Sequence, residues 1–159
     1  MNEHSFIKSI HRHLPNDLIT WKINDQFAGG VPDAFYAGDK GLIFIEYKFR
    51  PKFPVKDTSL MGFGLKPQQI NWLNSLKNKG ISTAVVAGCQ DLVIITANYF
   101  SLANITKGQF MGQTLLTRKD AAKWISDSCL DLGEDESNGI CSTTRVTTSS
   151  TKPSQDMES

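Results

Sequence analysis

Two carboxylates and one lysine are close together in a short stretch of this sequence. Asp33 precedes, and Glu46 and Lys48 follow, the turn-forming run Gly38-Asp39-Lys40-Gly41. This run between two apolar segments predicts a β-hairpin in which Gly38 faces Gly41. Paired residue numbers then add up to 79, so Asp33 lies opposite Glu46. Because side chains alternate along a strand, Lys48 shares their face of the hairpin.

Such a pair of acids needs a compensating charge. Directly opposed Cβ atoms in a hairpin are only ~5 Å apart, and two carboxylates at that distance repel each other. A divalent cation held between Asp33 and Glu46 is the simplest explanation, because magnesium prefers oxygen ligands. The alternative is a structural hairpin in which Lys48 neutralises both acids.

The elements that must position these residues follow from the periodicity of the chain. The segment from Leu42 to Lys48 is apolar on both faces until Glu46, which predicts a strand covered by helices on both sides. Glu46 then ends a buried strand, where a lone charge is expensive. We expect strands over Leu18–Asn24, Asp33–Ala37, Leu42–Lys48, Ser82–Ala87 and Leu92–Thr96. We expect helices over Glu3–His13, Pro67–Lys79 and Thr117–Cys129, with a short one near Tyr99–Leu102 in the otherwise unassigned segment 98–113.

Two further polar residues stand where they could reach the hairpin. Glu3 continues the apolar stripe of the first helix, beside Phe6. It is either a first-turn acid that favours the helix dipole or a third carboxylate aimed at the hairpin. Gln69 lies one turn before Leu73 on the helix that begins at Pro67, so its amide can point back toward the end of the sheet.

A basic, aromatic segment follows the hairpin. Gly and Pro residues argue against regular structure there, and a long loop in a compact domain is usually functional or disordered. Bases beside aromatic rings suit phosphate contacts and base stacking. The alternative is a solvated flap whose phenylalanines pack on the core. The segment contains Lys48, Arg50, Lys52, Lys56 and Lys66 against Asp57, interleaved with Phe49, Phe53 and Phe63.

Length and composition limit the remaining possibilities. The 159 residues suit one domain, and residues 133–159 predict a disordered Ser/Thr-rich acidic tail. That tail carries five acids and two bases, a net charge of −3, which leaves +4 on residues 1–132 because the whole chain carries +1. No apolar run is long enough to span a membrane, and the N-terminus lacks signal-peptide features. Three widely spaced cysteines favour a reducing compartment, hence the cytoplasm. The three histidines of the first helix are expected to be surface residues, with phosphate contacts as the alternative.

The order of these elements and residues resembles the PD-(D/E)XK nuclease superfamily, through Pro32-Asp33 and Glu46-Tyr47-Lys48. Gly29 to Asp33 together with Leu65 to Gln69 and Trp72-Leu73 resembles its VRR-NUC branch, found in viral and repair nucleases. The resemblance covers about residues 3–88. It implies an α/β fold with a restriction-endonuclease-like core, a mixed sheet of about four to five strands flanked by helices, over residues 1–132.

The resemblance also implies Mg²⁺-dependent cleavage of DNA, with Mn²⁺ as a substitute. Asp33, Glu46 and the backbone carbonyl of Tyr47 would ligate the metal, and Lys48 would position the attacking water. Gln69 matches the helix glutamine of the family and Glu3 its variable N-terminal acid. Junction-cleaving members often act as dimers, so branched DNA and a homodimer are expectations, in the host cytoplasm if the protein is viral. We expect DNA contacts from Gly30, Arg50, Lys52, Lys56 and Lys66. The alternative is a catalytically silent nucleic-acid-binding module with the same fold.

Overall fold

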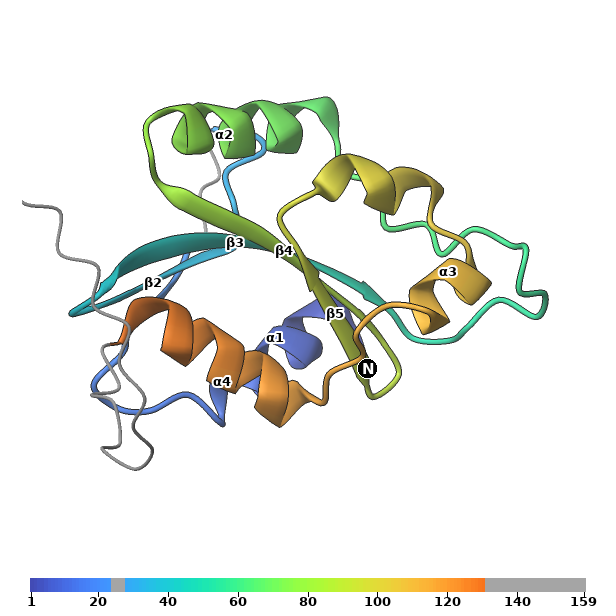
Figure 1. The fold of residues 1–159 in the computed structure, drawn as a ribbon, viewed down its shortest axis with the longest axis horizontal. Helices are drawn as coiled ribbons and strands as arrows, with labels where there is room; N and C mark the ends of the chain where they lie inside the picture. The colour runs from blue at the N-terminus through green and yellow to red at the C-terminus, as the bar shows by residue number, and fades with distance from the viewer. Residues whose placement is uncertain (24–27, 131–159) are drawn as a thin grey trace, which may run out of the picture.

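A five-stranded mixed sheet forms the centre of the molecule (Figure 1). The computed structural model describes residues 1–23 and 28–130. The strands are hydrogen-bonded in the order β1-β2-β3-β4-β5, with β3 and β4 parallel and the other neighbours antiparallel. Their bounds are β1 Ile19–Lys22, β2 Ala34–Gly38, β3 Gly41–Arg50, β4 Ser82–Cys89 and β5 Leu92–Thr96.

Helices cover both sides of this sheet. Figure 1 shows α2 on one side and α1 with α4 on the other, which confirms the predicted α/β fold class. The expected short helix near Tyr99 is a 3-10 helix. The helices are α1 Glu3–His11, α2 Pro67–Asn78, η1 Tyr99–Asn104, α3 Lys107–Met111 and α4 Arg118–Cys129.

The hairpin of β2 and β3 has the register predicted from its turn. Gly38 pairs with Gly41 and Ala34 with Ile45, so the paired numbers add up to 79 along the whole ladder. Gly38 also packs against the end of α4, where an added Cβ would lie 2.5 Å from Leu130 Cδ2. Any larger residue there would push the hairpin turn away from α4.

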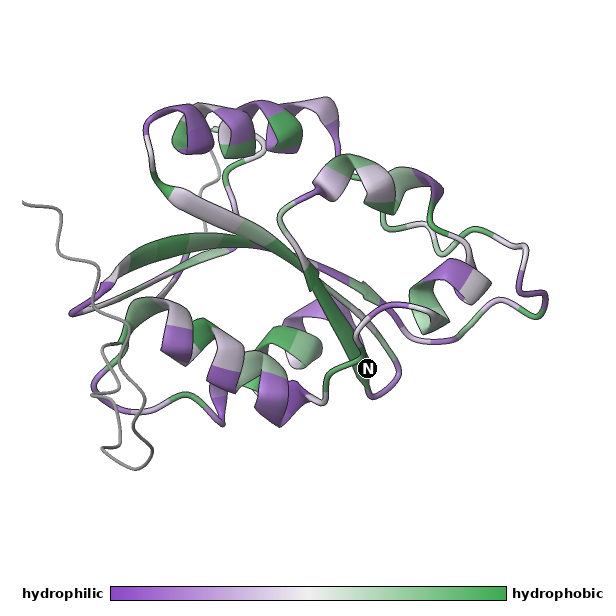
Figure 2. Ribbon diagram, viewed as in Figure 1, coloured by the Kyte–Doolittle hydropathy of each residue, from purple (hydrophilic) through white to green (hydrophobic). Residues whose placement is uncertain are grey.

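The larger hydrophobic core lies between the sheet and the pair α1 and α4. Phe6 and Ile10 from α1 and Ile125 from α4 are fully buried against Ile45 of β3. In Figure 2 the apolar stripes of these helices are turned toward the strands. The apolar spacing that predicted the helices therefore also fixes which side each one buries.

A second core lies under α2, η1 and α3, and phenylalanines of the basic, aromatic segment pack in it. Phe53 and Phe63 each pack with Phe110 of α3, at ring-centroid distances of 5.8 Å. Phe49 belongs to β3 and stacks on Phe6 at 4.8 Å. These phenylalanines pack on the core, as in the alternative of a flap whose phenylalanines pack inward. The expectation that they stack on bases is wrong for them.

Helix α3 falls in the segment that the sequence left unassigned. Thr106 accepts a hydrogen bond from the backbone of Gln109, whose side chain caps the backbone of Thr106 in return. This capping box and the burial of Phe110 hold a helix of only five residues. So short a segment, with Gly108 inside it, has no helical periodicity to detect.

The expectation that helices cover both faces of β3 is wrong for its first half. Leu42 is 42% exposed and Phe44 is only partly buried. The contacts of α2 with the sheet are mainly with β4, because α2 connects β3 to its parallel neighbour and packs over that neighbour. No helix of the described residues lies over the same face of β1 and β2.

Within the described part of the chain, every helix is too short or too polar to cross a bilayer. The expected tail, residues 133–159, lies outside the described residues.

Candidate active site

The carboxylate of Asp33 is tied to the neighbouring strand. Asp33 directly precedes β2, and its Oδ2 accepts a hydrogen bond from the backbone N–H of Tyr47 at 2.7 Å. Its carbonyl accepts the N–H of Ile23 at 2.8 Å. Asp33 is thereby held between the end of β1 and Tyr47 inside β3, beside Glu46, as the hairpin register predicts.

Glu46 is the centre of the site. It is 1% exposed, and its Oε1 accepts hydrogen bonds from Lys48 Nζ at 2.7 Å and from Gln69 Nε2. Its Oε2 is buried and has no hydrogen-bond partner among the described residues. A buried carboxylate oxygen without a partner is costly, so this atom marks where a further positive group fits.

Gln69 links the start of α2 to this carboxylate. Its Oε1 accepts the backbone N–H of Lys66 at 2.9 Å, while its Nε2 donates to Glu46. Pro67 has no backbone N–H and suits the first position of the helix. The backbone N–H of Lys66, just before it, donates to the side chain of Gln69, three residues after Lys66. The amide thus points back to the sheet, as its position one turn before Leu73 predicted.

Glu3 reaches the site from the opposite side of the sheet. It lies in the first turn of α1, and the backbone of Phe49 is close enough to its carboxylate to lower the pKa of that group, against the larger effect of burial. Lys48 and Asp33 lie close enough to influence its charge. Both interpretations of Glu3 therefore describe its position, since it is a first-turn acid and also borders the acid pair.

Burial and mutual repulsion shift the acids of the site in the same direction. Burial, and then the charge of Asp33, raises the pKa of Glu46 to about 7, although Lys48 opposes the shift. Burial likewise raises the pKa of Asp33 and of Glu3 above their ordinary values.

The donor set fits a magnesium ion. Two carboxylates with hard oxygens stand side by side, and Oε2 of Glu46 has no hydrogen-bond partner among the described residues. The backbone N–H of Tyr47 is used by Asp33, while its side chain points into the larger core, so its carbonyl is what it could offer a metal. No group of three or more His, Cys, Asp or Glu side chains placed to hold a metal occurs in residues 1–23 and 28–130.

A buried hydrogen-bond chain behind the site was not predicted. The hydroxyl of Tyr47 bonds that of Tyr36 at 2.5 Å, and Tyr36 bonds His11 Nε2 at 2.7 Å. His11 is therefore partly buried on α1 and was wrongly expected at the surface. Burial, and then the charge of Lys22, lower the pKa of its imidazole. This chain of hydrogen bonds links Tyr47, the strand residue between Glu46 and Lys48, to α1.

The five residues expected to contact DNA have different surroundings. The side chains of Lys52, Lys56 and Lys66 are exposed. Arg50 instead donates to the carbonyls of Lys52 at 3.0 Å and Met61 at 2.8 Å, which holds the loop 51–61 closed. Gly30 has a φ of +85° and packs so closely on α2 that an added Cβ would lie 2.5 Å from the backbone carbon of Gln68. The positive φ and the close packing on α2 explain why position 30 is a glycine, and no DNA contact is needed to explain it.

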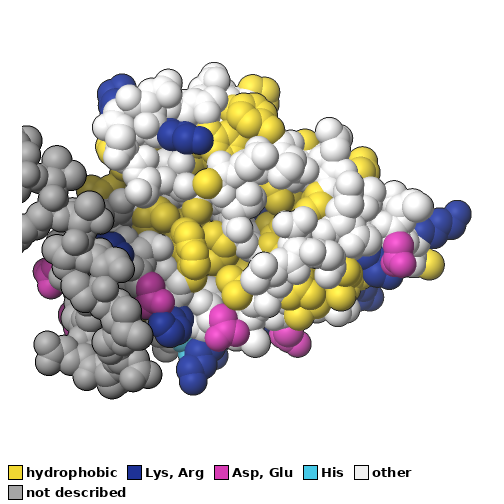
Figure 3. All heavy atoms as spheres, in the orientation of Figure 1, with side chains coloured by type: hydrophobic (Ala, Val, Ile, Leu, Met, Phe, Trp, Pro, Cys, Tyr) yellow, Lys and Arg dark blue, Asp and Glu magenta, His cyan; other side chains and the backbone are white. Residues whose placement is uncertain are grey.

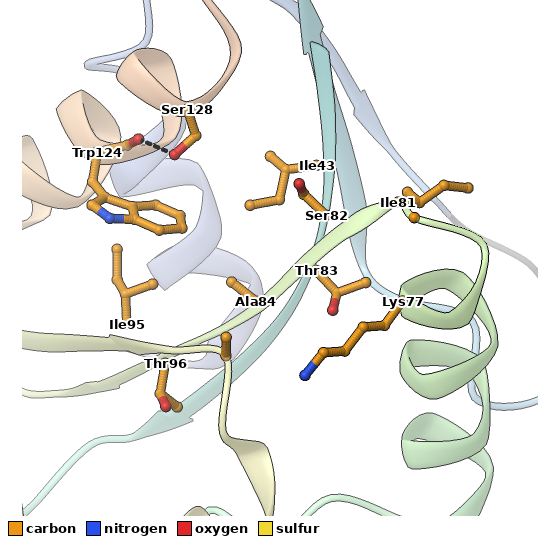
Figure 4. Close-up of a pocket in the computed structure, with 12 residues that line it drawn as sticks. Ile43, Lys77, Ile81, Ser82, Thr83, Ala84, Ile95, Thr96, Trp124 and Ser128 are labelled. Atoms are coloured by element: carbon orange, nitrogen blue, oxygen red, sulfur yellow. Dashed lines mark hydrogen bonds between the residues drawn. The ribbon is translucent and has the colours of Figure 1, made fainter. Parts of the chain in front are cut away.

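A cavity of about 470 Å³ lies away from the acids. Figure 4 shows Trp124 and Ser128 of α4 on one side of it and Lys77 of α2 on the other, with Ile43 and Thr83 between them. In Figure 3 hydrophobic side chains lie over this middle region, and charged ones mainly around the rim. Among the described residues the cavity is lined mostly by apolar and hydroxyl groups and has no carboxylate.

No protein-family model matches the sequence, and no curated protein matches it. Among solved structures, the chain is similar to Hjc, a Holliday junction resolvase of Archaeoglobus fulgidus, a hyperthermophilic archaeon. The two are 12% identical over 76% of this chain and 99% of that chain, with a TM-score of 0.47.

Proposed function

We propose that this protein is a metal-dependent endonuclease that hydrolyses phosphodiester bonds in DNA. The observation that supports this most strongly is the unpartnered Oε2 of the buried Glu46, next to Asp33 and Lys48. A pair of acids in this state is unfavourable in the folded protein and becomes favourable when a cation binds.

The residues of the site have distinct roles in this proposal. Asp33, Glu46 and the carbonyl of Tyr47 would hold Mg²⁺, or Mn²⁺ in its place. The bound ion would supply an activated water and stabilise the negative charge that develops at the phosphate. Gln69 and Lys48 hold Glu46 in one orientation through Oε1. Lys48, held beside Glu46, would orient the attacking water.

Contacts with DNA would come from the exposed Lys52, Lys56 and Lys66, which follow Lys48 in the chain. Branched DNA as substrate, a homodimer and membership of the VRR-NUC branch belong to the same proposal. Cleavage of a panel of junction, flap, duplex and single-stranded DNAs tests the substrate. The mass of the protein in solution tests the homodimer.

The decisive experiment measures metal binding and cleavage in parallel. Calorimetric titration with Mg²⁺ and Mn²⁺ should show binding that Asp33→Ala and Glu46→Ala remove. Asp39→Ala, at the exposed turn of the same hairpin, is the matched control and should bind as the parent does. If the parent cleaves none of the DNAs but still binds them, the silent binding module is the better description.

A further inference from the structure

Three aromatic rings form a row across the uncovered face of the sheet. Trp21 of β1 pairs with Phe35 of β2, and Phe35 pairs with Phe44 of β3, so their side chains share one face. The rings of Trp21 and Phe35 are nearly parallel, at 7°, with centroids 6.3 Å apart, and those of Phe35 and Phe44 are 5.5 Å apart. Trp21 is 62% exposed and the two phenylalanines are partly exposed. We call these three residues the aromatic row.

The aromatic row is continuous with the acid pair. Phe44 and Glu46 are two residues apart on β3 and point to the same face, so they are separated by about 7 Å. Asp33 stands in the same relation to Phe35. A base attached to the sugar beside a phosphate at Glu46 could therefore reach the row.

Helix α2 borders this face with another aromatic ring and with positive charge. Gln68 packs against Gly30, just before β2, which shows which flank of α2 faces that strand. Trp72, 38% exposed, and Lys79, exposed, follow on the same flank one and three turns later. Residues 58–90 contain Lys66, Lys77 and Lys79 and no Asp or Glu. The border of the face is thus complementary to a polyanion.

We propose that the aromatic row binds unpaired nucleotides of DNA beside the phosphate at the acid pair. Exposed ring faces next to lysines are how single strands are bound without sequence preference, because every base has a face that can stack. The substrate class would then be DNA with an unpaired segment at the cleavage point, and the proposal deepens the endonuclease function and rests on it. A second copy of this chain is the competing occupant, since β1 is a sheet edge and Ile19 is also exposed.

The test measures binding without cleavage. Anisotropy of a labelled oligothymidylate is recorded in EDTA for the parent, Trp21→Ala and Trp21→Phe. Trp124→Ala, a partly exposed tryptophan on α4 across the sheet, is the matched control. We expect Trp21→Ala to lose about tenfold in affinity, Trp21→Phe to recover part of it, and Trp124→Ala to bind as the parent does. An abasic oligomer of the same length, which keeps the phosphates, should bind equally to all four proteins.

The outcomes separate this proposal from the proposed function. If the parent cleaves DNA but Trp21→Ala binds and cleaves unpaired DNA as the parent does, the row is not a nucleotide site, while the endonuclease stands. If the parent cleaves no DNA yet Trp21-dependent binding is found, the row stands and the endonuclease fails. If Trp21→Ala converts a dimer into a monomer, by sedimentation, with unchanged affinity for the oligomer, the row is a contact between copies and the proposal is overturned.

Discussion

The two faces of β3 are made by alternate residues of one strand and differ in almost every property. Ile45 and Tyr47 face α1 and α4, are fully buried and belong to the larger core. Phe44, Glu46 and Lys48 face the side of α2, which covers only part of that surface. The first face holds the fold together, and the second bears its polar groups and exposed rings. A strand that is apolar on both sides in sequence can therefore have one face packed in the core and another that is only partly covered.

The largest expected effect comes from the acids of the open face. Asp33→Ala or Glu46→Ala should reduce DNA cleavage by at least about a thousandfold, because both the metal and its activated water are lost. The folded fraction should stay that of the parent, since a buried charge is removed rather than an apolar contact. Cleavage rates and circular dichroism check this together. Substantial cleavage by Glu46→Ala would move the chemistry away from the acid pair.

On the closed face, stability should change instead of activity. Ile45→Ala should lower the free energy of unfolding by about 3 kcal/mol, because it leaves a cavity in the larger core. Phe44→Ala, although it removes a larger side chain, should cost about half as much, because that ring is already partly in water. Urea denaturation of both variants measures the two values. A greater loss for Phe44→Ala would mean that the open face is packed as the closed one is.

The pH dependence of stability should also distinguish the faces. The folded protein holds the pKa of Glu46 at about 7, above its ordinary value of 4.5. Its protonated form is thus the favoured one, so stability is fully present below about pH 4.5 and falls as the pH rises through 7. The loss is on the order of 3 kcal/mol. The raised pKa values of Asp33 and Glu3 act in the same direction.

Glu46→Gln should remove most of this fall and melt above the parent at pH 8 in EDTA. Saturating Mg²⁺ should raise the melting temperature of the parent and not that of the variant. Scanning calorimetry at pH 5 and pH 8 makes the comparison. A variant that melts below the parent at pH 8 would show that the carboxylate has a partner that stabilises its charge.

The smallest expected effect concerns the loop that follows β3. Lys52→Glu with Lys56→Glu should weaken DNA binding and make its salt dependence less steep, by roughly one to two units of slope if each lysine contacts one phosphate. Lys119 is exposed on α4, and Lys119→Glu is the control because it makes the same charge change as each of the two substitutions. Unchanged affinity at low salt would place the DNA elsewhere, with the aromatic row and Lys79 as the remaining candidates.

Several features of this site followed from the sequence because they depend on neighbours in the chain. The turn Gly38–Gly41 sets the hairpin register, and alternation places Asp33, Glu46 and Lys48 on one face. Gln69 followed from helical spacing, one turn before the buried Leu73. These are local rules of strands and helices, so they need no knowledge of the rest of the fold.

Only the tertiary structure decided which apolar and basic residues are covered. Phe53 and Phe63 pack on Phe110, some fifty residues away, and Arg50 is used to close its own loop. Phe44 stays partly open because α2 packs over β4. The sequence does not show whether a given phenylalanine is buried or exposed, because its burial depends on packing against residues far away in the chain. The sequence by itself thus determined where the acids meet, and the packing of α2 determined what surface lies beside them.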